Sequence, residues 1–222
     1  MRAVHAITNF PRVYPGEATG ANEQDFCARK LKAIRHLDGV CQQHVKATAR
    51  NLQLAREHRL RPVVLVRNIF DIVPSLTDHF HHESRHFPTG FVPEWFLNAD
   101  EEKKWMFTIK LHLPWYLNFL LSWQEAEQEL PIYWLTYQQL FANPTEVIRD
   151  LLCFWNISVP EKSIEYGLQQ VAIQNTRMNK GIAGRGQLLS SYHRQELLEL
   201  VDLTNLPPRL ESLIGIDAED NT

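Results

Sequence analysis

The sequence of 222 residues has few cysteines, little net charge and no long apolar run. Its three cysteines, Cys27, Cys41 and Cys153, form no CxxC pair, which excludes a disulfide framework and favours a reducing compartment. We expect all three to be small buried residues. The net charge of -3 argues against a general nucleic-acid surface, and no stretch approaches the roughly 20 apolar residues that span a bilayer. The sequence therefore predicts a cytoplasmic protein with no nucleic-acid partner and no membrane segment.

The sequence also lacks the common glycine-rich phosphate motifs. Neither GxxxxGK[ST] nor GxGxxG occurs, which argues against a P-loop kinase and a dinucleotide-binding domain. A histidine-rich stretch does occur, in which His82 and His86 have the spacing of a helical zinc pair. Pro88 and Gly90 follow closely and indicate that the helix ends there, so we expect no metal site.

The apolar pattern predicts two strands among many helices. "PVVLVR" (62–67) has the continuous apolar run of a strand covered on both faces, and "PIYWLTY" (131–137) is a second strand. A short strand is also expected at 39–45. Helical spacing covers 25–37, 48–60, 100–129 with a break at Pro114, 143–157, 161–172 and 191–203. This alternation predicts one α/β domain over 1–222, with a mainly parallel sheet and a loop-like segment at 1–24.

Arg67 and Ser75 mark a candidate anion site. Arg67 ends the first strand, where α/β proteins bind ligands, and its guanidinium suits a phosphate or carboxylate. We expect Asp71 to cap the next helix, Ser75 to add a hydroxyl and unpaired N–H groups at the helix start to attract an anion. Tyr137 stands at the end of the second strand. A structural ion pair between Arg67 and Asp71 is the alternative.

A second basic element lies at 177–186, "RMNKGIAGRG". It places Arg177, Lys180 and Arg185 among glycines that allow the backbone to approach an anion closely. A solvated basic loop is the alternative interpretation of this stretch.

Three stretches, in this order, resemble the sulfotransferases that use 3'-phosphoadenosine-5'-phosphosulfate (PAPS). "VVLVRNIFDIVPSL" resembles the family's strand–Arg–helix–Ser element, "YWLTYQQLFANPTEVIRDLLCFWNI" its "YEdL…nP" segment, and "NKGIAGRG" its late "RKG…G" loop. The resemblance implies a P-loop-NTPase-like parallel sheet flanked by helices, incomplete at the N-terminus. It also implies transfer of a sulfuryl group from PAPS to a hydroxyl or amine of a small-molecule or glycan acceptor.

The resemblance assigns the nucleotide-binding residues. Arg67 and Ser75 would hold the 3'-phosphate, and Lys180 with Gly181 would close over it. Arg177 or Arg185 would replace the arginine that usually precedes the family's Lys-Gly pair. Tyr137 would lie against the adenine.

The resemblance also suggests residues for catalysis. His44 falls where the family often has the histidine that takes the proton from the acceptor, a role that suits its near-neutral pKa. A surface or half-buried histidine without a catalytic role is the alternative. Lys46 would stabilise charge on the transferring sulfuryl group.

One element of the family pattern is missing from the sequence. Such enzymes normally carry a loop like "PKSGTTW" that holds the 5'-phosphosulfate, whereas "NFPRVYPGEATG" lacks the Ser-Gly-Thr core. Two hypotheses therefore stay open. The chain is a PAPS-dependent sulfotransferase, or it is a truncated or non-catalytic relative that binds a 3'-phosphonucleotide or a protein partner.

Overall fold

The computed structural model describes residues 1–16, 24–84, 86–87, 90–173 and 184–216. The strands are β1 (Val63–Val66), β2 (His86–Phe87), β3 (Gly90–Phe91) and β4 (Tyr133–Thr136). The helices are α1 (Arg2–Thr8), α2 (Ala28–Ile34), α3 (Ala49–Glu57), α4 (Ile69–His82), α5 (Trp95–Asn98), α6 (Glu101–Leu111), α7 (Leu113–Ala126), α8 (Tyr137–Ala142), α9 (Pro144–Phe154), α10 (Glu161–Ile173), the 3₁₀ helix η1 (Arg185–Leu188), α11 (Ser191–Thr204) and α12 (Pro208–Leu213).

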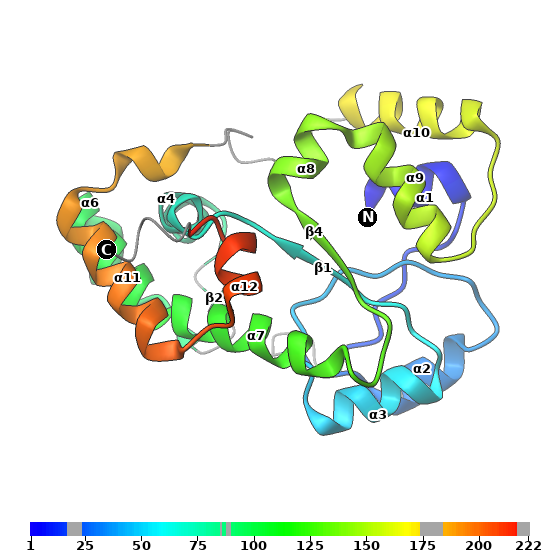
Figure 1. Ribbon diagram of the computed structural model, residues 1–222, viewed down its shortest axis with the longest axis horizontal. Coiled ribbons are helices and arrows are strands. Elements are labelled where there is room, and N and C mark those ends of the chain that lie inside the picture. The colour runs from blue at the N-terminus through cyan, green and yellow to red at the C-terminus, as the bar shows by residue number, and fades with distance from the viewer. Residues whose placement is uncertain (17–23, 85, 88–89, 174–183, 217–222) are drawn as a thin grey trace.

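The two predicted strands pair in parallel at the centre of the protein (Figure 1). Val63 pairs with Tyr133 and Val66 with Thr136, so both strands end at the same level. The chain between them forms α4 to α7, including the predicted break near Pro114, where α6 ends at Leu111 and α7 begins at Leu113. The α/β prediction with a parallel sheet is confirmed.

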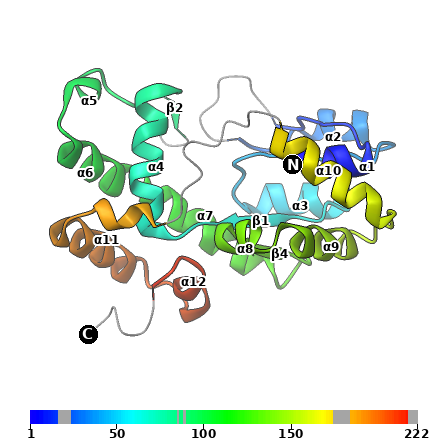
Figure 2. The ribbon, with the colours of Figure 1, turned by 90° about the horizontal axis from the view of Figure 1, so that it is seen from above.

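Helices lie on both sides of this sheet (Figures 1 and 2). Val64 and Val66 of β1 join the main core, which also includes residues of α4, α6, α7, α11 and α12. On the opposite face, Leu135 of β4 packs with residues of α1, α9 and α10. Val64 and Val66 thus face one side of the sheet, and Leu65, which pairs with Leu135, faces the other, because successive side chains of a strand point to opposite faces.

The prediction that β1 is covered on both faces is wrong at one position. Leu65 pairs with Leu135 in the register, but Leu65 is 48% exposed whereas Leu135 is 4% exposed. The helices of the second core therefore cover β4 and leave part of β1 open, in the part of the chain that the structure describes.

The segment 1–24 is not loop-like throughout, because residues 2–8 form α1. Val4 and Ile7, three residues apart, are buried on one face of this helix. α1 packs on α10, where Gly167 allows the approach: a Cβ on Gly167 would lie 2.3 Å from Cγ1 of Ile7.

The strand expected at 39–45 does not form beyond a single bridge between Val40 and Arg12. Neighbouring backbone groups bond to side chains instead: the Val45 carbonyl accepts from Nε1 of Trp123, and the Ala47 N–H donates to Oγ of Ser122. Both partners lie on α7, so this segment is fixed by a helix rather than by a neighbouring strand.

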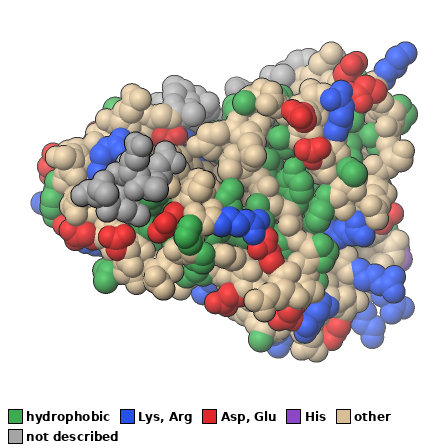
Figure 3. All heavy atoms as spheres, in the orientation of Figure 1, with side chains coloured by type: hydrophobic (Ala, Val, Ile, Leu, Met, Phe, Trp, Pro, Cys, Tyr) green, Lys and Arg blue, Asp and Glu red, His purple; other side chains and the backbone are tan. Residues whose placement is uncertain are grey.

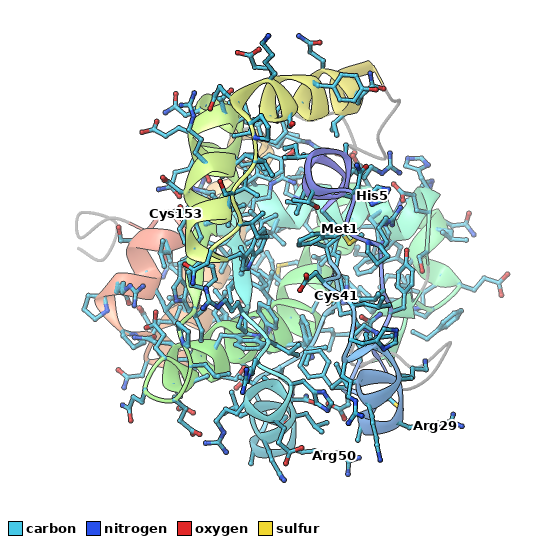
Figure 4. The ribbon with its side chains drawn as sticks, turned by 90° about the vertical axis from the view of Figure 1, so that its right-hand side faces the viewer. Met1, His5, Arg29, Cys41, Arg50 and Cys153 are labelled. Carbon is cyan, nitrogen blue, oxygen red and sulfur yellow. The ribbon has the colours of Figure 1, made fainter. Side chains whose placement is uncertain are left out.

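The cysteines differ from the expectation of uniform burial. Cys27 is buried, whereas Cys41 and Cys153 are exposed, and all three are free thiols. Figure 4 shows Cys153 on α9 and Cys41 well apart from it. Among the described residues, no helix is long and apolar enough to cross a membrane.

Candidate nucleotide site at the strand ends

The parallel register brings Arg67 and Tyr137 together. They are the first residues after the paired strand ends Val66 and Thr136. The guanidinium carbon of Arg67 lies 4.7 Å from the centre of the Tyr137 ring, a cation–π contact. The strand ends thus form one site, as parallel strands predict.

Ser75 joins this site from the next helix. Nη1 of Arg67 donates a hydrogen bond to Oγ of Ser75 over 2.8 Å. Both residues are half-buried, so the pair keeps contact with solvent. A hydroxyl that accepts one hydrogen bond can still donate its proton to an anion, and a guanidinium has several N–H donors. The arrangement suits a phosphate or carboxylate.

The backbone of Arg67 is held by Tyr116 of α7. The Arg67 N–H donates to the Tyr116 hydroxyl (3.3 Å), and that hydroxyl lies 3.4 Å from the Arg67 carbonyl oxygen. Burial raises the pKa of Tyr116, so the phenol stays neutral and can both accept and donate. No local sequence pattern marks this residue, because its partner is 49 residues away.

The start of α4 differs from the prediction. Asn68, not Asp71, is the N-cap, and its Oδ1 accepts from the N–H groups of Phe70 and Asp71. The Ile69 N–H donates to the carbonyl of Ile214, just after α12. The expected unpaired N–H groups are therefore occupied within the protein. In the part of the chain that the structure describes, the candidate anion site is therefore formed by side chains.

Asp71 and Arg185 have partners other than those expected. The Asp71 carboxylate accepts hydrogen bonds from the N–H groups of Gly184 (2.9 Å) and Gly186 (2.7 Å), instead of forming the alternative ion pair with Arg67. Nη2 of Arg185 pairs with Oδ2 of Asp78 at 2.7 Å. Arg177, Lys180 and Gly181 lie outside the described residues.

His44 lies near Trp115 of α7 and close enough to His79 of α4 to be affected by its charge. The His44 ring contacts Trp115 edge-on, with centroids 6.5 Å apart, and its backbone N–H donates to Oε1 of Gln24. His44 retains solvent contact, but the surrounding protein displaces enough water to lower its pKa, and the charge of His79 lowers it further. A histidine in this state is neutral near pH 7 and can accept a proton.

Lys46 is half-buried two residues further on. Its carbonyl oxygen accepts from Nδ2 of Asn51, which also donates to Asp25. The buried amide of Asn51 thus holds the backbone at Lys46, two residues after His44.

Comparison with known proteins identifies the family to which the chain belongs. Residues 29–184 match the sequence profile of the sulfotransferase domain. The chain belongs to this family. The match includes the Arg67–Ser75 pair, Tyr137 and both predicted catalytic residues. Membership supports a sulfotransferase-like function with PAPS as the sulfate donor.

The sulfotransferase fold is also found by structural similarity. The structure resembles the crystal structure of mouse sulfotransferase SULT7A1 complexed with PAP, with a TM-score of 0.66. The similarity covers 96% of this chain and 80% of the mouse chain, at 11% sequence identity. At such low identity the likeness shows the fold.

The histidine-rich stretch of this member of the sulfotransferase family does not form a helical metal pair. Residues 82–86 read "HESRH", which fits the HExxH pattern of helical zinc sites. That geometry needs one helix through both histidines, but α4 ends at His82 and His86 begins β2. Within the described ranges, no group of three or more potential ligands is close enough to hold a metal ion.

Other basic side chains lie away from the strand ends. On the face in Figure 3 many gather over α2 and α3, and Arg29 and Arg50 point into solvent in Figure 4. Because α3 leads into the amino end of β1, these side chains are at the opposite end of the strand from Arg67. They do not contribute to the Arg67–Ser75 site.

Proposed function

We propose that this protein is a PAPS-dependent sulfotransferase that binds the nucleotide at the ends of β1 and β4. The observation that carries the proposal is the direct contact of Arg67 with both Ser75 and Tyr137. A guanidinium and a hydroxyl suit the 3'-phosphate, and the neighbouring phenol ring suits stacking against adenine. Family membership supports the same assignment.

The remaining nucleotide contacts are proposed from the family pattern. Lys180 and Gly181 close over the 3'-phosphate, and Arg177 adds positive charge. Arg185 is the weaker candidate, because its guanidinium already pairs with Asp78 and its side chain is only 10% exposed.

In the proposed reaction, a hydroxyl or amine of a small-molecule or glycan acceptor attacks the sulfur of PAPS. The new bond to sulfur forms as the bond between sulfur and the 5'-phosphate oxygen breaks, and 3',5'-adenosine bisphosphate (PAP) leaves. His44 takes the acceptor's proton, and the Lys46 ammonium stabilises charge on the sulfuryl group. The lowered pKa of His44 supports its role as base.

A non-catalytic nucleotide-binding relative is the second candidate. The observation in its favour is the lack of a Ser-Gly-Thr loop in "NFPRVYPGEATG". In the described part of this stretch, Nη2 of Arg12 donates to the Tyr14 hydroxyl, and the backbone of Arg12 forms an isolated β-bridge with Val40. We also propose a cytoplasmic location, which three free thiols support.

Calorimetric titration with PAP tests the nucleotide site. We expect wild-type protein to bind PAP and Arg67→Ala to bind it about 10- to 100-fold more weakly, because charge-assisted hydrogen bonds are lost. Arg29→Ala is the matched control, since it removes an equal charge from an exposed position. Equal affinity of Arg67→Ala and wild type would contradict the proposed site. Release of PAP from PAPS with an acceptor panel then distinguishes the enzyme from the non-catalytic candidate.

A further inference from the structure

Three polar side chains share one face of α4. Asp71, Ser75 and Asp78 are spaced i, i+4 and i+7, which aligns them along the helix. Ser75, in the middle, bonds to Arg67. The two aspartates on either side bond to residues 184–186, more than 100 residues away in the sequence.

Asp71 makes the tightest of these connections. The residue is 3% exposed, and its two carboxylate oxygens each accept one backbone N–H, from Gly184 and Gly186. A buried carboxylate is costly unless such bonds compensate it, and bonds to a charged acceptor are strong. These two hydrogen bonds therefore fix both the position and the orientation of the backbone at Gly184 and Gly186.

Gly186 packs directly against the helix. A Cβ on Gly186 would lie 2.5 Å from Cβ of Phe70 and 3.1 Å from its carbonyl carbon, so no larger residue fits. Arg194 of α11 closes the contact from the other side, because Nη2 donates to the Gly186 carbonyl and the guanidinium lies 4.7 Å from the Phe70 ring centre.

The Arg185–Asp78 pair adds a third connection one turn beyond Ser75. It is a 2.7 Å contact between side chains that are 10% and 25% exposed. Partial burial reduces screening by water, so the attraction between these two charges is stronger than in a fully exposed ion pair. Residues 184, 185 and 186 are thus all attached to the helix that carries Ser75.

We propose that Asp71 and Asp78 are positioning residues for the nucleotide site. They attach residues 184–186, which begin three residues after Gly181 in the sequence, to the helix that carries Ser75. This inference rests on the proposed function, in which Lys180 and Gly181 contact the 3'-phosphate.

The proposal makes a prediction opposite in sign to simple electrostatics. Removing a negative charge beside a phosphate site should strengthen binding of an anionic nucleotide if charge alone matters. In Asp71→Asn, however, the amide has one oxygen and one NH₂ group, so one of the two glycine N–H groups would face a donor. The anchor would loosen and binding would weaken.

The experiment compares PAP with 5'-AMP, which lacks the 3'-phosphate, by calorimetry and competition. We expect Asp71→Asn to weaken PAP binding about 10-fold while AMP affinity stays nearly unchanged. A merely structural defect would not change the ratio of the two affinities. The control is Asp202→Asn, which removes the same charge from an exposed site on α11.

A second set of variants tests Asp78 and remains available if Asp71→Asn does not fold. Asp78→Asn and Arg185→Gln should weaken PAP binding by similar factors, and the double variant should be no weaker than either. If Arg185→Gln alone has a large effect, Arg185 contacts the nucleotide directly and the positioning role of Asp78 is wrong.

The outcomes separate this inference from the function on which it rests. Unchanged or tighter PAP binding by Asp71→Asn, with Arg67→Ala still defective, would overturn the positioning role alone. Wild-type protein that binds no PAP would overturn both. Hydrogen exchange provides a check without nucleotide: the Gly184 and Gly186 amides should exchange faster in Asp71→Asn than in wild type.

Discussion

His112 should make this protein less stable as the pH falls. The residue lies between α6 and α7 and is 4% exposed, and its ring packs against Phe80 at 4.3 Å and Phe107 at 5.3 Å between centroids. Burial lowers the pKa of His112 to about 3, compared with about 6.5 in an unfolded chain. The ring is therefore neutral in the folded protein over the whole range in which the unfolded chain takes up a proton.

The sign and size of the effect follow from this difference. Above pH 6.5 His112 is neutral in both states and imposes no penalty. As the pH falls below 6.5, only the unfolded state binds the proton, and the free energy of unfolding falls by about 1.4 kcal/mol per pH unit until the pH nears 3. Between about pH 7 and about pH 5 the loss from this group is about 2 kcal/mol.

Urea denaturation of wild type and His112→Leu at these two pH values measures the effect. Leucine keeps a side chain of similar size and cannot titrate, so the variant should lose about 2 kcal/mol less than wild type on acidification. His36→Leu, which removes an exposed histidine, should follow wild type. Equal losses in wild type and His112→Leu would show that the ring is not held neutral, and the reasoning would fail.

Two further predictions concern catalysis and the packing of α1. If His44 is the base, its lowered pKa places the acid limb of kcat/KM below pH 6.5. His79→Gln removes a charge that lowers the pKa of His44, so the acid limb should shift to higher pH; an unchanged limb would contradict this. His44→Gln should reduce kcat about 100-fold or more without weakening PAP binding. Gly167→Ala should lower the thermal midpoint because the clash with Ile7, about 1–3 kcal/mol, outweighs the roughly 1 kcal/mol gain in helix propensity. A raised midpoint would show that α1 does not pack this closely on α10.

Sequence patterns were sufficient for the elements that depend on neighbouring residues. The apolar runs at 62–67 and 131–137 became β1 and β4, and most helices formed where apolar spacing predicted them. Two parallel strands whose ends are in register necessarily bring Arg67 and Tyr137 together. The sequence therefore predicted that these two residues lie at one edge of the sheet, and the register of the strands brings them into contact.

Burial on each face could not be inferred in this way. An apolar run indicates that a strand can be covered on both faces, but not whether a helix covers each position. Leu135 is covered by the packing of α1, α9 and α10, whereas Leu65 beside it is exposed. Similarly, "GVCQQHV" looks like a strand, but its backbone bonds to Ser122 and Trp123 of α7.

The hydrogen-bond partners around α4 were decided by tertiary structure. Asn68 and Asp71 are both suitable helix caps, and nothing local indicates that Asp71 bonds to Gly184 and Gly186, 113 and 115 residues away. Arg185 was predicted to bind phosphate because it lies in a basic stretch, and the fold places its guanidinium against Asp78. The sequence determined which residues can bind an anion or cap a helix. Only the folded chain decided which pairs form, because a buried polar group takes the partner that the fold brings within hydrogen-bonding distance.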